Sequence, residues 1–162
     1  MNQLNEPLTF TVPLSFTAHS LAEQFRCQQS NPQKAKQVYL NTLAVYAVDF
    51  YLQCLGVETE IERSDSCNAL RLKFMNVADL WVKSIGRLEC RPILPKAEVL
   101  AIPIEVREDR VGYVAVQFDQ SLKQATLVGF TSMAVAELPL DQLRSLEEFP
   151  EYLNQLRETK RV

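Results

Sequence analysis

Apolar residues recur with a helical period in two stretches of the first third of the chain. The first stretch carries the apolar stripe Ala18, Leu21, Ala22 and Phe25. This spacing is typical of an amphipathic helix, and Ser15 or Thr17 is suited to cap its N-terminus. We therefore predict a first helix that ends near Ser30. A short edge strand should precede it over 8–12, where apolar and polar residues alternate.

A second, longer helix is predicted from Asn31 to Leu55. Asn31 is a good N-cap residue, and Pro32 occupies the first helical position, where its missing N–H is not needed. The second half of this helix has almost no polar face, so we expect it to be buried in the middle of the fold. Gly56 is suited to end the helix, because glycine adopts the left-handed conformation without a steric penalty.

After Gly56 the pattern changes to short alternating runs of apolar and polar residues. These runs span 57–61, 77–82, 87–94, 99–104, 110–118 and 125–131. Alternation with a period of two is typical of strands, and the last two runs predict a hairpin with a polar turn over 119–124. We expect an antiparallel sheet or small barrel, with 64–68 as its most mobile loop.

The C-terminal segment, 139–157, repeats large apolar residues at near-helical spacing. Its stripe consists of Leu140, Leu143, Leu146, Phe149, Leu153 and Leu156. We expect Pro150 to break the segment into two short helices, because a proline inside a helix removes a hydrogen bond and clashes with the preceding turn. Two uses of the stripe are open: it is a candidate interaction stripe for a partner protein, or it closes the chain's own core.

Together these elements predict an α+β fold. In it, an N-terminal helical pair packs on an antiparallel β-sheet or small barrel, and short helices lie at the C-terminal end. A chain of 162 residues fits one domain. We expect a single domain over 1–162, with a mainly helical half at 1–56, a β half at 57–131 and a helical segment at 132–162.

Composition and charge narrow the class of protein. With 47% hydrophobic and 23% charged residues, the chain has the composition of a globular domain. Its formal net charge of −3 gives no general attraction to nucleic-acid phosphates, so nucleic acid is not the expected partner. No apolar run approaches the ~18 residues of a membrane span, and four widely spaced cysteines suit reduced thiols. We expect a cytoplasmic protein without membrane contact.

The familiar routes to catalysis lack their residues. The four cysteines form no C-x-x-C pair, the four glycines form no phosphate-binding loop, and a single histidine cannot supply a multi-imidazole metal site. We expect that histidine, His19, to be an ordinary surface side chain. The sequence therefore predicts no cofactor, no metal site and no catalytic residue of a familiar kind.

Asp49 is the most unusual residue of the pattern, because it lies in the most apolar part of the second predicted helix. A buried carboxylate needs a cationic or hydrogen-bonding partner. We expect Arg87 or Arg91, on a neighbouring predicted strand, to be that partner. The candidate polar core or site therefore consists of Asp49, Arg87, Glu89 and Arg91.

Two functional alternatives are open beside a structural role for these residues. The first is an enzyme with an unfamiliar active site made of Asp49, Glu89, Cys90 and Arg91. The second is a small nucleic-acid-binding module on the surface from Trp81 to Lys96. There an aromatic ring lies among basic side chains, a combination that binds single strands. Those basic side chains are Lys83, Arg87, Arg91 and Lys96.

Several long segments carry a family resemblance. They are 10–13 (FTVP), 31–48 (NPQKAKQVYLNTLAVYAV), 88–92 (LECRP) and 112–117 (GYVAVQ). In these segments the chain resembles an uncharacterised cyanobacterial family, domain of unknown function 1822. The resemblance brings no activity, cofactor or catalytic residue. The family resembles one whose genes accompany regulatory genes such as those of sigma factors, which implies a regulator or adaptor. The resemblance also implies that some functions of the family can reside in a C-terminal extension.

The expected function follows from these exclusions and from the resemblance. We expect a non-enzymatic cytoplasmic interaction or regulatory module, an adaptor whose protein partner the sequence does not identify. An enzyme would instead need a concave pocket with convergent polar groups. A nucleic-acid binder would need an open basic surface.

Overall fold

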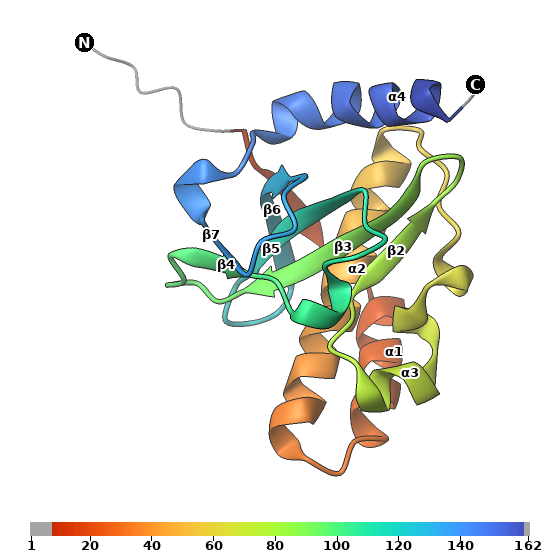
Figure 1. Ribbon diagram of the computed structural model, residues 1–162. Helices are drawn as coiled ribbons and strands as arrows, with labels where there is room; N and C mark the ends of the chain where they lie inside the picture. Colours follow the sequence, from red (N-terminus) through yellow and green to blue (C-terminus); the bar gives the residue numbers. More distant parts are fainter. Residues whose placement is uncertain (1–7, 161–162) are drawn as a thin grey trace.

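The structure, a computed structural model, describes residues 8–160 of the chain (Figure 1). This part folds into a mixed α+β structure with a curled five-stranded sheet and four helices. The predicted α+β class is confirmed. The helices are not all N-terminal, however, because α3 (Ala69–Phe74) lies in the middle of the chain. Of the predicted single domain, 1–7 and 161–162 lie outside the described residues.

The two N-terminal helices form where the sequence predicts them. α1 spans Phe16–Cys27 and α2 spans Pro32–Cys54. The side chains of Ser15 and Asn31 accept hydrogen bonds from the first free N–H groups of these helices, as capping residues do. Twelve residues of α2 are buried, so the predicted central helix is confirmed. It ends before Gly56, which adopts the left-handed conformation with φ 72°.

The large sheet has the strand order β1–β6–β5–β3–β2. Its strands are β1 (Phe10–Pro13), β2 (Asp79–Val82), β3 (Gly86–Ile93), β5 (Gly112–Phe118) and β6 (Gln124–Thr131). Neighbouring strands are antiparallel except β3 and β5, which run parallel. The prediction of a wholly antiparallel sheet is therefore wrong. The chain between β3 and β5 is long enough to cross back and enter β5 in the same direction.

A small second sheet and the last helix complete the fold. β4 (Val99–Ala101) pairs with β7 (Glu137–Pro139) in antiparallel fashion. The helix α4 spans Phe149–Thr159 and contains Pro150 in its first turn. Pro150 therefore starts a helix and does not break one, because the first turn does not use its missing N–H. The prediction of two helices separated by Pro150 is wrong.

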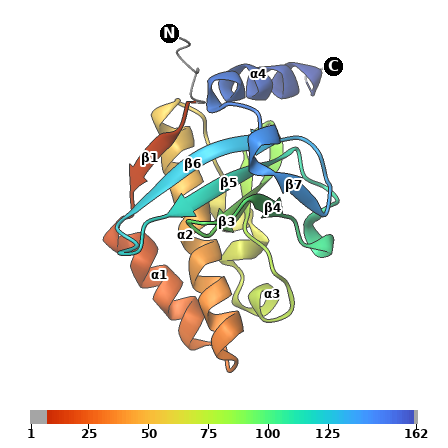
Figure 2. The same cartoon turned by 90° about the vertical axis from the view of Figure 1, so that its left-hand side faces the viewer.

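Two hydrophobic clusters lie on opposite faces of the sheet. The larger cluster fills the space between α2 and the sheet and includes Leu43, Leu80 and Val114. The second cluster covers the other face of β5, where Tyr113 and Ala115 pack. Figure 2 shows α1 and α2 together below the sheet, with β1 at its outer edge. Apolar residues thus pack on both faces of the sheet.

The C-terminal apolar stripe packs on these two clusters. Leu146, Phe149 and Leu153 are buried in the larger cluster. The half-buried members Leu156, Leu140 and Leu143 pack against one cluster or the other. The candidate interaction stripe therefore closes the chain's own core, which is the second of the two uses that the sequence leaves open. Among the four helices of the described part, none is long and apolar enough to span a membrane.

Candidate functional site

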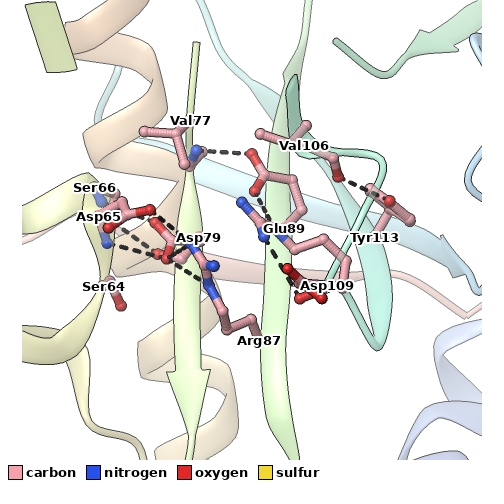
Figure 3. A network of polar contacts seen from close by, with 12 residues as sticks. Ser64, Asp65, Ser66, Val77, Asp79, Arg87, Glu89, Val106, Asp109 and Tyr113 are labelled. Carbon is pink, nitrogen blue, oxygen red and sulfur yellow. Dashed lines mark hydrogen bonds and ion pairs between the residues drawn. The ribbon is translucent and has the colours of Figure 1, made fainter. Parts of the chain in front are cut away.

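A row of charged side chains lies on the face of β2 and β3 that points away from α2 (Figure 3). Leu88 and Cys90 of β3 point into the larger core. Because successive side chains of a strand point to opposite faces, the intervening residues Arg87, Glu89 and Arg91 point to the other face. This placement gathers three of the four residues of the predicted polar core on one surface of the sheet.

One end of the row is centred on Asp79, whose side chain is fully buried. Its carboxylate accepts hydrogen bonds from the backbone N–H groups of Asp65 at 3.0 Å and Ser66 at 2.8 Å. The Arg87 guanidinium donates to Asp79 at 2.9 Å and to Asp65 at 2.8 Å. This end therefore ties the segment 64–68 to β2. The segment 64–68, for which the sequence predicts a mobile loop, has its Ser64 and Ser66 side chains buried against the sheet.

The other end is centred on Glu89, which is also fully buried. Its carboxylate accepts from Ala78 N–H at 2.7 Å, from Arg110 Nε at 2.9 Å and from Arg91 Nη1 at 3.1 Å. Arg91 also donates a hydrogen bond from Nη2 to the side-chain oxygen of Asn76, at 2.9 Å. The row therefore joins β2, β3 and the turn before β5 by charge-assisted hydrogen bonds.

The electrostatic balance of the row is complete. Its three arginines, Arg87, Arg91 and Arg110, face three carboxylates, Asp65, Asp79 and Glu89. Burial raises the pKa of Glu89, although Arg91 and Arg110 act in the opposite direction. Burial lowers the pKa of Arg87, but its contacts with Asp79 and Asp65 outweigh that effect and raise it overall. Both oxygens of Asp79 and both oxygens of Glu89 accept hydrogen bonds, so the row acts as a buried network that holds the structure together.

Asp49 does not belong to this row. It is buried on α2, where it accepts hydrogen bonds from Gln53 Nε2 at 2.7 Å and from the Thr59 hydroxyl. The prediction that Arg87 or Arg91 pairs with Asp49 is wrong. The physical reason is the face of β3: both arginines point away from α2, toward Asp79 and Glu89.

The four residues of the alternative active site are not brought together. Glu89 and Cys90 are fully buried on opposite faces of β3, while Asp49 and Arg91 line two separate hollows. Burial raises the pKa of the Cys90 thiol well above its usual range. A buried, protonated thiol is not a nucleophile. Within residues 8–160 no cluster of three His, Cys, Asp or Glu side chains is placed to hold a metal ion.

The only tryptophan of the chain lies at a more open place. Trp81 is half-buried and separates two adjoining hollows of about 640 and 510 Å³ that share Trp81, Gly86 and Lys160. We call their lining residues the Trp81 surface. Six basic side chains line it against three acidic ones. The basic ones are Arg63, Lys83, Arg87, Arg110, Arg157 and Lys160, and the acidic ones are Glu58, Glu60 and Asp109.

The Trp81 surface overlaps only partly with the predicted nucleic-acid surface. Lys83 and Arg87 belong to both, whereas Arg91 is buried in the ionic row and Lys96 lines neither hollow. The Arg63 guanidinium lies 4.4 Å from the centre of the Trp81 ring, as a cation–π contact. Sequence reasoning missed Arg63, Arg157 and Lys160, because only the fold brings 63, 81 and 157–160 side by side.

The expectation for His19 is also corrected by the structure. His19 is half-buried, and its Nε2 donates to the Leu122 carbonyl at 2.7 Å while Nδ1 lies 2.6 Å from the Tyr39 hydroxyl. It therefore links α1, α2 and the β5–β6 turn and is not an ordinary surface side chain. Cys54 is exposed at the end of α2.

Fold and site together define an α+β domain with a balanced ionic layer in its sheet and a basic, aromatic hollow at its surface. The chain belongs to the family described as "Protein of unknown function (DUF1822)", whose model matches residues 12–162. The resemblance stated from the sequence is thereby confirmed at the level of the family. Comparisons with curated proteins and with solved structures found no match.

Proposed function

We propose that the chain is a non-enzymatic interaction module that binds an acidic segment of a partner protein at the Trp81 surface. The observation that carries the proposal is the only tryptophan, half-exposed in a hollow lined mainly by basic side chains. Tryptophan and arginine are the residues most enriched where binding energy is concentrated in protein interfaces. An excess of basic groups selects an acidic partner.

Two cations of this surface are available to a partner. Within residues 8–160, the Arg157 guanidinium has no hydrogen-bonded carboxylate, and Lys160 donates to the neutral carbonyl of Ile85. The other four basic side chains are already paired with carboxylates of the chain. Arg157 and Lys160 therefore supply the net positive charge, and Trp81 supplies the apolar contact.

The backbone supports a fixed shape for this hollow. Ser84 and Gly86, in the turn between β2 and β3, have φ values of 65° and 138°. Left-handed conformations outside glycine are costly and are retained where the surrounding structure determines them. At Gly86 a Cβ would lie 2.8 Å from Val111 and 3.0 Å from Lys160, so only glycine lets these side chains approach. The hollow is thus formed before any partner arrives.

The competing functions receive less support. An enzyme would require convergence of Asp49, Glu89, Cys90 and Arg91, but the fold brings only Glu89 and Arg91 together. A single-strand binder is less supported, because the formal net charge of −3 gives no general attraction to a phosphate backbone. The proposal also includes a cytoplasmic location, a regulatory role and a cyanobacterial source. The family resemblance and the widely spaced cysteines support these parts.

Fluorescence of Trp81 tests the proposal directly, because no other tryptophan contributes to the signal. We expect a short polyglutamate peptide to change the emission saturably, with an affinity that weakens as salt is added. The double variant Arg157→Ala/Lys160→Ala should lower the affinity about tenfold or more. The matched control Lys96→Ala/Lys123→Ala removes two exposed lysines outside the hollows and should change it little.

Two results would contradict this function. An unchanged emission over the whole titration would show that the Trp81 surface does not bind acidic peptides. Tighter binding of an oligothymidylate of equal length would favour the nucleic-acid alternative over the interaction module. Thermal unfolding of both double variants, measured beside the titrations, separates loss of binding from loss of folding.

A further inference from the structure

A small pocket lies between the start of α1 and the C-terminal half of α2, away from the ionic row. Its volume is about 240 Å³. Leu14, Ala18, Tyr46 and Phe50 form apolar parts of its wall, and the Asp49 carboxylate lines it as well. An apolar pocket with one convergent charged group is the usual form of a site for a small ligand group.

The Asp49 carboxylate has hydrogen-bond donors but no cation. Its side chain accepts from Gln53 Nε2 at 2.7 Å and from the Thr59 hydroxyl, and both donors are neutral. Asp49 takes part in none of the ion pairs of residues 8–160. A carboxylate oxygen can accept two hydrogen bonds, and each Asp49 oxygen accepts one from these two donors, so each has a free acceptor position.

The other buried charged side chains of the described residues are paired with opposite charges. Asp79 is paired with Arg87, and Glu89 is paired with Arg91 and Arg110. Asp49, with 8% of its surface exposed, is the one buried charged side chain of residues 8–160 that lacks an opposite charge. A buried ion without a counter-charge is costly. A cation from outside the chain would remove that cost.

The surroundings of Asp49 are electrically negative. The pKa of Tyr46 is raised by burial and then by negative charges that include Asp49 and Glu62. The pKa of Cys67 is raised by burial and then by Asp79, Glu62 and Asp49. No basic side chain contributes to either shift. Glu62 therefore adds a second negative charge near Tyr46, beside that of Asp49.

We propose that this pocket binds an alkylammonium group, with its nitrogen on the Asp49 carboxylate and its carbon chain against Leu14 and Phe50. The aromatic rings of Tyr46 and Phe50 add cation–π attraction. Free alkylamines and the lysine side chain of a partner share this chemistry.

Titration of the full chain with two probes tests the pocket. The probes are n-butylammonium, a free amine, and Nα-acetyl-lysine N-methylamide, which presents a lysine side chain. In two-dimensional amide spectra we expect saturable shifts at Tyr46, Asp49, Phe50 and Gln53. Saturation with both probes identifies a site for any alkylammonium, and saturation with only one identifies its source. 1-Butanol, which has the same carbon chain without the charge, should produce no saturable shift.

Variants separate the charge from the shape of the pocket. Asp49→Asn should weaken binding about tenfold or more, since a hydrogen bond to an ionised group contributes far more than one to a neutral group. Asp141→Asn, at an exposed carboxylate elsewhere, should change nothing. If Asp49→Asn does not fold, Phe50→Ala replaces it, because Phe50 is 41% exposed and its loss should weaken binding without unfolding the chain.

Three results would overturn the assignment. The first is that neither probe saturates at the pocket. The second is that 1-butanol binds as tightly as n-butylammonium. The third is that a folded Asp49→Asn variant binds as tightly as the parent chain. None of these measurements uses the Trp81 surface, so the pocket and the proposed interaction function stand or fall separately.

Discussion

At the scale of single residues, the ionic row explains how a sheet with a core on both faces carries buried charges. Asp79 and Glu89 lie directly opposite each other in the β2–β3 register, where two like charges repel. Arg87 compensates the first carboxylate, and Arg91 and Arg110 compensate the second. The arginines therefore decide whether β2 and β3 pair stably, and removal of one partner should affect the whole row.

Asp79→Asn should destabilise the fold by about 3–5 kcal/mol, because it breaks an ion pair whose carboxylate is fully buried and leaves the half-buried Arg87 with only the half-exposed Asp65 as counter-charge. Denaturant unfolding measures this change. Hydrogen exchange should also speed up at the amides of Asp65 and Ser66, which donate to Asp79. The exposed substitution Asp141→Asn is the control. A loss below about 1 kcal/mol, the range of surface ion pairs, would contradict a structural role for the row.

At the scale of elements, α2 depends on its first turn as well as on burial. The Asn31 side chain accepts hydrogen bonds from the N–H groups of Gln33 at 2.8 Å and Lys34 at 3.1 Å. Asn31→Ala should therefore lower the free energy of unfolding by about 1 kcal/mol. Asn31→Ser, which keeps a capping oxygen, should lower it by less than about 0.5 kcal/mol. Equal losses in the two variants would show that the cap does not hold this helix.

The strand β6 depends on a close approach at Gly129. A Cβ there would lie 2.9 Å from the Arg144 carbonyl oxygen and from the Leu143 side chain. The next residue, Phe130, exchanges backbone hydrogen bonds with Arg144 at 3.0 and 2.8 Å. Gly129→Ala should push the two segments apart and cost about 1–3 kcal/mol, as overpacking does. Thermal unfolding measures this loss of stability, with Gln124→Ala, a substitution at an exposed position of the same strand, as the control.

At the scale of the whole molecule, the four cysteines differ in how far the packing of the fold buries them. Cys27 and Cys54 are exposed, Cys67 is half-buried, and Cys90 lies wholly within the larger cluster. Burial raises the pKa of both Cys67 and Cys90, which lowers the thiolate fraction that reacts. The order of reactivity should therefore follow the order of exposure.

Alkylation with iodoacetamide, read by peptide mass mapping, tests this order. In the folded chain Cys27 and Cys54 should react first, Cys67 more slowly, and Cys90 only after denaturant is added. The denatured chain is the control, since all four thiols should then react alike. Rapid modification of Cys90 in the folded chain would contradict its place in the core and would reopen a catalytic role for that thiol.

The local elements of this protein were predictable because the signals for them lie close together in the chain. The capping residues Ser15 and Asn31, the apolar α2 and the β5–β6 hairpin all depend on neighbours within a few residues. Such signals act in any fold. The same reasoning placed Arg87, Glu89 and Arg91 in a candidate polar core, although it paired the two arginines with Asp49.

The tertiary structure decided what depends on residues far apart in sequence. Alternation along β3 shows that Arg87 and Cys90 point to opposite faces, but only the position of α2 shows which face is which. The parallel pairing of β3 with β5 depends on a crossover that periodicity does not reveal. For the same reason the Trp81 surface and the Asp49 pocket emerge only when distant segments pack together. The sequence by itself determined α1, α2, the β5–β6 hairpin and the family, and long-range packing determined which charges are paired.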